Sequence, residues 1–82
     1  MPTVKRIGGL RVVIYPNDHR PAHVHIIGHG NEAIFKLHCP NGAPDLRENF
    51  GFSGQEIGDI KAAFADDLAY LCKEWRKIHG EI

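Results

Sequence analysis

The sequence has little of what marks several large classes of protein. Its 82 residues contain only two cysteines, Cys39 and Cys72, which are too few for a disulfide scaffold. No segment approaches the ~20 consecutive apolar residues of a membrane span. Lys plus Arg and Asp plus Glu both number 10, so the net charge of zero gives no overall attraction for nucleic acid or anionic membrane. These absences favour one small globular domain over residues 1–82, with no membrane association.

The N-terminus does not have the pattern of a secretory signal. Lys5 and Arg6 precede an apolar run, but Arg11 interrupts that run and no small-residue cleavage site follows. We interpret Cys39 and Cys72 as reduced thiols because they fall in different predicted elements, and a single disulfide stays open as the alternative. The sequence therefore predicts a cytoplasmic location.

A first hairpin is predicted around Gly8-Gly9. The flanking runs over 4–7 and 10–15 are rich in β-branched residues, and two glycines supply the positive φ angles of a two-residue turn. Strand alternation then divides the side chains between two faces. Ile7, Leu10, Val12 and Ile14 lie on one face, and Val4, Arg6, Arg11, Val13 and Tyr15 on the other.

A second hairpin is predicted over 23–28 and 32–38, with residue 27 opposite residue 32. A slip of one residue would exchange core and surface, so the hydrophobic pattern favours this register. The apolar face consists of Val24, Ile26, Ala33, Phe35 and Leu37, and the polar face carries His23, His25, Glu32, Lys36 and His38.

The second half of the chain predicts a loop and then a helix. Residues 40–52 are rich in Pro, Gly and Asn, which is typical of a loop. Ser53 and Glu56 match a capping box, and Gly80 is a helix stop. Between the capping box and Gly80, apolar residues recur at steps of three and four and form one helical stripe: Ile57, Ile60, Phe64, Leu68, Leu71, Trp75 and Ile78. The expected fold is α+β, with a four-stranded antiparallel sheet of two hairpins packed on one long C-terminal helix.

The strongest functional signal is a histidine cluster at the start of the second hairpin. His19, His23 and His25 fall within seven positions, and the last two share a strand face. Two imidazoles in reach of one bond are suited to acid–base cleavage of a phosphodiester. We therefore predict these three histidines as catalytic. The cations that would hold the phosphate are Arg11, Arg20 and Lys36, with Arg6 as a further candidate.

Two other interpretations of the same histidines stay open. His23 and His25, with His38 or His19, have the residue types of a catalytic zinc site, which often has three such ligands. The cofactor is then a single divalent metal such as zinc, whereas acid–base chemistry needs none. In the third interpretation the histidines only hydrogen-bond on a polar sheet face. Outside this cluster, Phe50 and Phe52 are expected to pin the loop over the core, and with Arg47 they form an alternative base-stacking surface.

The sequence also resembles a known family, the domain of unknown function family 4160 of small prokaryotic proteins. The resemblance lies in Gly8-Gly9-Leu10-Arg11, in the run Asp18-His19-Arg20-Pro21-Ala22-His23-Val24-His25, and in Trp75. Family members often have a second Pro where this chain has Ala22, and an aromatic residue where it has Val24. The resemblance implies a gene setting like that of a toxin–antitoxin module. It suggests a toxin-like protein acting on RNA, whose partner is a small neighbouring antitoxin-like protein or a second copy of the chain. The alternative is a non-enzymatic metal- or protein-binding module.

Overall fold

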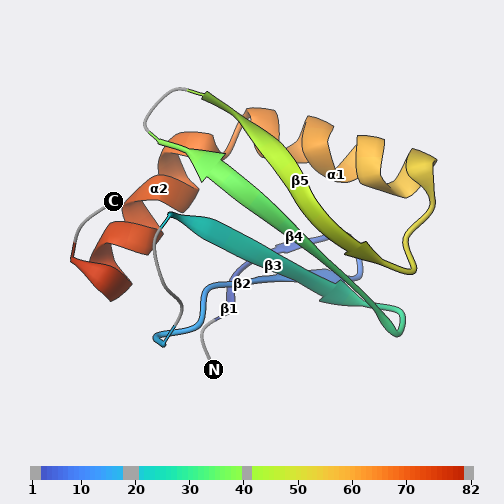
Figure 1. Cartoon of the computed structure of the whole chain (residues 1–82), viewed down its shortest axis with the longest axis horizontal. Coiled ribbons are helices and arrows are strands. Elements are labelled where there is room, and N and C mark those ends of the chain that lie inside the picture. The colour runs from blue at the N-terminus through green and yellow to red at the C-terminus, as the bar shows by residue number, and fades with distance from the viewer. Residues whose placement is uncertain (1–2, 18–20, 40–41, 81–82) are drawn as a thin grey trace.

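The computed structural model describes residues 3–17, 21–39 and 42–80, and it has five strands followed by two helices (Figure 1). The strands pair in the order β1-β2-β3-β4-β5, and every pair is antiparallel. Each strand therefore lies beside the strand that precedes it in the chain. The elements are β1 (Thr3–Ile7), β2 (Leu10–Val13), β3 (His23–Gly28), β4 (Asn31–His38), β5 (Gly42–Phe50), α1 (Gly54–Ala65) and α2 (Leu68–His79).

Both predicted hairpins are confirmed in their registers. Ile7 pairs with Leu10 around Gly8, whose φ of 59° lies in the left-handed region. In the second hairpin Ile27 pairs with Glu32, as the hydrophobic pattern predicts. The turn residues His29 and Gly30 have φ angles of 53° and 76°. Positive φ at both central residues is the geometry whose twist matches that of the flanking strands.

The prediction of a loop over 40–52 is wrong, because β5 occupies most of it. This strand pairs with β4 along one side only and is an edge strand of the sheet. Pro44 is compatible with that position, since an edge strand has a side that needs no ladder donor. Side chains from Asp45 to Phe50 are all exposed, and irregularities interrupt the register twice. The strand therefore lacks the alternation that identifies a half-buried strand in a sequence.

The single long helix is also wrong, because the chain bends between two helices of 12 residues each. Asp66 caps the end of α1, and Asp67 precedes α2 with φ −114° and ψ 4°, outside helical values. The Asp67 carboxylate lies 3.2 Å from Nζ of Lys5 on β1. The apolar stripe nevertheless continues across the bend from Phe64 to Leu71, and both residues are fully buried. The stripe predicts which residues face the sheet, but it does not reveal the change of helix direction.

The two helices cover one face of the sheet, as Figure 1 shows, and the core lies between them. The predicted apolar face is confirmed, because all five of its residues are buried. Phe35 contacts Phe64 edge to face with ring centroids 5.3 Å apart. Val4, by contrast, packs against the core because an irregularity between Thr3 and Lys5 shifts the register of β1.

A disulfide joins Cys39, just after β4, to Cys72 on α2. The two Cα atoms are 5.8 Å apart although 33 positions separate the residues in the chain. The interpretation of both cysteines as reduced thiols is therefore wrong, and the alternative of a single disulfide is correct. The two residues meet because α2 packs beside the end of β4, a contact between distant segments that their spacing does not encode. None of the helices in the described ranges is long and apolar enough to cross a membrane.

Candidate active site on the open sheet face

The sheet face away from the helices carries two of the three histidines predicted as catalytic, His23 and His25. Figure 1 shows this face uncovered by either helix along β3 and β4. Val24 and Ile26 are fully buried on the helix side, while His23 and His25 are half-buried. The alternation predicted from the sequence is thus present. We call this surface the open face.

His25 and Glu32 form an imidazole–carboxylate pair at the centre of the open face. Nδ1 of His25 lies 3.0 Å from Oε2 of Glu32 on the neighbouring strand. The contact favours the tautomer in which Nδ1 donates to the carboxylate and Nε2 is the basic nitrogen. The His25 side chain is only 12% exposed, and the ring of Tyr15 packs against it at 4.9 Å between centroids. Glu32 and Tyr15 therefore fix the orientation of this imidazole.

His23 lies between His25 and the core. Its ring centroid is 5.3 Å from that of His25 and 5.3 Å from that of Trp75. Nδ1 of His23 is 2.9 Å from the backbone oxygen of Pro21 and donates to it in the matching tautomer. The two imidazoles are thus neighbours, and each is oriented through its Nδ1 by a different acceptor.

His38 belongs to a separate pair. Its Nε2 lies 2.6 Å from Oδ2 of Asp45, across the β4–β5 ladder. Among the described residues, no three His, Cys, Asp or Glu side chains converge in a way that could hold a metal ion. In the part of the chain that the structure describes, His38 therefore does not join His23 and His25 in a group of this kind. His19 and Arg20 lie outside the described residues.

The predicted cations that are described, Arg11 and Lys36, flank the histidine pair. Arg11 pairs with Ile27 on β3, and Lys36 pairs with His23. Directly opposed residues of an antiparallel pair project to the same side, so both cations belong to the open face. They lie on opposite sides of His25 along the strand direction.

His79 is a neighbour of the site that the sequence analysis missed. Its ring stacks on Trp75 with centroids 3.9 Å apart, and its Nε2 lies 3.1 Å from the backbone oxygen of Tyr15. In the sequence it is one more polar residue at the C-terminal end of the predicted helix. The signal that could have found it is its spacing, because a residue four positions after Trp75 lies on the same helix face.

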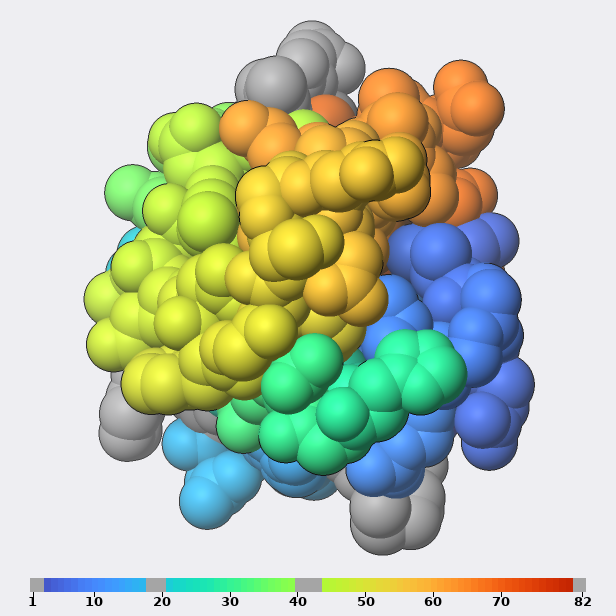
Figure 2. Space-filling model, turned by 90° about the vertical axis from the view of Figure 1, so that its right-hand side faces the viewer, coloured from blue at the N-terminus to red at the C-terminus, as the bar shows by residue number. Residues whose placement is uncertain are grey.

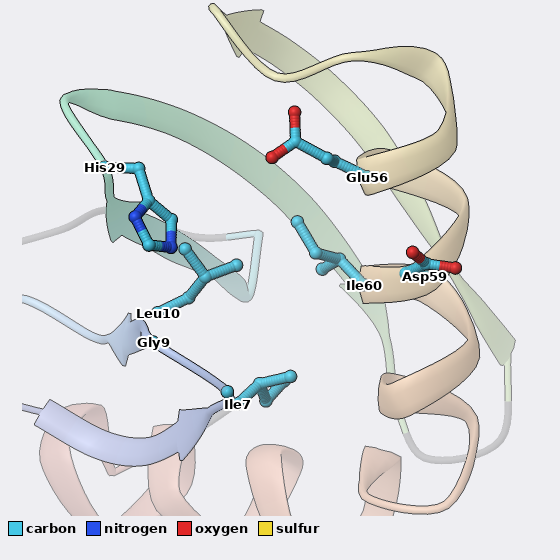
Figure 3. A pocket seen from close by; sticks show the side chains of 8 residues that line it. Ile7, Gly9, Leu10, His29, Glu56, Asp59 and Ile60 are labelled. Atoms are coloured by element: carbon cyan, nitrogen blue, oxygen red, sulfur yellow. The ribbon is translucent and has the colours of Figure 1, made fainter.

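A cleft of about 240 Å³ lies near the C-terminal end of β3, at the other end of the strand from His23. Figure 2 shows α1 between β5 and the first hairpin, with the β3–β4 turn beside it. In Figure 3 the Glu56 side chain extends from α1 toward His29 across the opening. Hydrogen bonds from the Ser53 backbone and side chain, and to a lesser degree the charge of His29, lower the pKa of the Glu56 carboxyl. This cleft contains none of the predicted site residues. Its lining comprises Ile7, Gly8, Gly9, Leu10, His29, Glu56, Asp59 and Ile60.

Comparison with known families assigns the chain to one of them. Residues 9–76 match the family described as Domain of unknown function (DUF4160), so the protein belongs to this family. The match includes His23, His25 and Glu32 of the open face as well as Trp75 of the core. No curated protein and no solved structure matches the chain.

Proposed function

We propose that the protein cleaves RNA on its open face, as the toxin-like component of a two-protein prokaryotic module. The observation that carries this proposal is the His25–Glu32 pair, 3.0 Å apart, beside a second imidazole on His23. A base oriented by a carboxylate and placed next to another titratable group is a recurrent arrangement in acid–base catalysis. The resemblance to the family implies a gene setting of this kind.

The proposed reaction is an internal transfer of the phosphodiester. Nε2 of His25 is buried in the free protein, so the proposal requires that RNA binding moves the side chains that cover it. Nε2 of neutral His25 then removes the proton of the 2′-hydroxyl, and the 2′-oxygen attacks phosphorus. The bond from phosphorus to the 5′-oxygen breaks, and protonated His23 donates a proton to the leaving oxygen. The products are a 2′,3′-cyclic phosphate and a 5′-hydroxyl. Arg11 and Lys36 neutralise the charge that develops on the non-bridging oxygens.

The roles of the two imidazoles follow from their partners. The Glu32 carboxylate stabilises the imidazolium that forms on His25 as it takes the proton. His23 instead donates to a neutral carbonyl, that of Pro21. Acid–base catalysis needs one imidazole neutral and the other protonated, so activity should depend on pH as a bell-shaped curve.

An RNA-cleavage assay with matched histidine variants tests the proposal. His25→Ala should lower kcat by about 10²- to 10⁴-fold, the usual contribution of a positioned acid or base. Glu32→Gln should also lower it, because the amide cannot stabilise the imidazolium. The control is His29→Ala, which removes an exposed histidine at the far end of β3. Equal activity of His25→Ala and the control would show that the cleavage comes from another site or from a contaminant.

A chelator distinguishes the metal alternative in the same assay. Acid–base cleavage by His23 and His25 should be unchanged in EDTA. Loss of activity in EDTA, with recovery on adding zinc, would instead favour a metal held by histidines.

A protein-binding role is the second candidate, and the edge strand favours it. Leu46 on β5 is 39% exposed, and the outer side of this strand has backbone groups that pair with no other strand of the described sheet. The expected partner is a small antitoxin-like protein or a second copy of the chain. Leu46→Lys should then abolish association in size-exclusion chromatography without unfolding the protein. This role would be contradicted if the protein is a monomer and also fails, at micromolar concentration, to bind the small protein encoded by the neighbouring gene.

A further inference from the structure

One row of side chains crosses the whole sheet on the open face. The register pairs Arg6 with Arg11, Arg11 with Ile27, Ile27 with Glu32, and Glu32 with Phe50. Opposed residues project to the same side, so the row contains one residue from each of the five strands. Arginines form its β1–β2 end, and an aromatic residue forms its β5 end.

Phe50 is the most exposed large hydrophobic residue of the described chain, at 57%. Two positions further on, Phe52 is 5% exposed and belongs to the core. The expectation that both phenylalanines pin the segment over the core is therefore correct for Phe52 and wrong for Phe50. Phe50 also lies directly opposite Glu32, the carboxylate that orients His25. An exposed ring is thus placed two strands away from the proposed catalytic base, with Glu32 on the strand between them.

The two ends of the row differ in the charge of the side chains around them. Among the described residues, neither the Arg6 nor the Arg11 guanidinium forms an ion pair, so both can receive an anion. At the other end Glu48 also projects from the open face, since it pairs with Ile34. This carboxylate disfavours a phosphate near β5, while the arginines favour one over β1 and β2. The row therefore matches a ligand with phosphates at one end and an aromatic face at the other.

We propose that the open face binds single-stranded RNA laid across the strands, with a base stacked on Phe50 and backbone phosphates on Arg6 and Arg11. This inference rests on the proposed function and specifies its substrate. Sheets that bind single strands use exposed aromatic side chains as stacking platforms in the same way. In a duplex the faces of the bases are already stacked, so Phe50 would have nothing to bind. The distance from β1 to β5 is about 19 Å at the usual strand spacing of about 4.8 Å, which one short RNA strand can span from end to end of the row.

Binding to an oligonucleotide that cannot be cleaved tests the inference separately from catalysis. The probe is a fluorescein-labelled oligonucleotide with 2′-O-methyl groups, measured by fluorescence anisotropy as a single strand and as a duplex. Phe50→Ala should weaken single-strand binding by about 5- to 100-fold, as for other stacked bases. Phe50→Trp should retain it, which separates loss of stacking from loss of structure. Tyr70→Ala, which removes an exposed aromatic ring on α2, is the matched control and should bind like wild type.

The arginines make a distinct prediction in the same experiment. Changing Arg6 and Arg11 to Gln should reduce the slope of log K against log[salt] by about 0.7 for each phosphate of the single strand that the variant no longer neutralises. Equal affinity for single strand and duplex, or equal effects of Phe50→Ala and Tyr70→Ala, would overturn the inference.

The outcomes also separate the inference from the proposed function. Wild-type protein that binds the single strand through Phe50 but cleaves no RNA would support the inference and contradict the proposed function. Protein that cleaves only duplex RNA, with Phe50→Ala as active as wild type, would support RNA cleavage as the function and contradict the inference about single strands.

Discussion

The indole of Trp75 and the imidazole of His23 lie with their ring centroids 5.3 Å apart, which couples the open face directly to the core. Trp75 is fully buried on α2, whereas His23 begins β3. The position of this imidazole consequently depends on how α2 packs against the sheet. Changes on the helix side of the molecule should therefore affect the geometry of the proposed site.

Replacing Trp75 tests this coupling. Trp75→Ala should lower the free energy of unfolding by about 3–5 kcal/mol, because the change leaves a large cavity in a fully buried position. Trp75→Phe should cost less stability, since it retains part of the ring volume. Urea denaturation measures both. The wild-type fluorescence should be blue-shifted and resistant to quenching by iodide, and easily quenched emission would contradict the burial of this residue.

The disulfide gives a second prediction. Closing a loop across 33 positions is expected to contribute about 3–4 kcal/mol by restricting the unfolded chain. Changing Cys39 and Cys72 together to Ser should therefore lower stability by roughly that amount. Wild type in dithiothreitol should show the same decrease. The double variant is the control for the reductant and should not respond to it.

Glu56 gives a third prediction, concerning acid stability. Its pKa is lowered from an ordinary value of 4.5 in the folded state, chiefly by the hydrogen bond from the Ser53 backbone. The carboxylate therefore stabilises the fold above pH 4.5, and the contribution disappears as pH falls through the lowered pKa. In the Glu56→Gln variant, the melting temperature should therefore fall less steeply below pH 4.5 than in wild type. Asp66→Asn, at the other end of α1, is the matched control, and parallel curves for wild type and Glu56→Gln would count against this role.

Gly58 gives a fourth prediction. It lies inside α1, and a Cβ added there would meet no atom within 4 Å. Gly58→Ala should stabilise the protein by about 0.5–1 kcal/mol, because alanine loses less backbone freedom on folding. Gly30→Ala should instead destabilise it, since Gly30 has a φ of 76° in the β3–β4 turn. Thermal unfolding of the two variants should give shifts of opposite sign.

The sequence predicts the parts of the fold that depend on local patterns. Gly8-Gly9 and the alternation around residues 27 and 32 specify both hairpins with their registers, because core-facing and solvent-facing residues differ in hydrophobicity. The same alternation places His25 and Arg11 on the open face. The partner of His25 is harder to predict from the sequence. Glu32 lies seven positions away and meets His25 only through the pairing of β3 with β4.

Features that depend on contacts between distant segments could not be predicted in this way. β5 is an edge strand with exposed side chains, so its sequence has the polar character of a loop. The bend at Asp66 and Asp67 does not interrupt the apolar stripe, because both helices face the same core. His79 and Cys72 meet their partners, Tyr15 and Cys39, only after α2 has packed on the sheet.

The strand order has a consequence for synthesis on the ribosome. Because each strand pairs with the one before it, hydrogen-bonding partners emerge in the order of translation. The residues that cover the apolar sheet face are located on α1 and α2, after the last strand. A nascent chain with all five strands but no helices would therefore present Val24, Ile26 and Phe35 to its surroundings. Chaperone capture or aggregation at that stage, before Trp75 is added, would be a hazard of making this fold from its N-terminus.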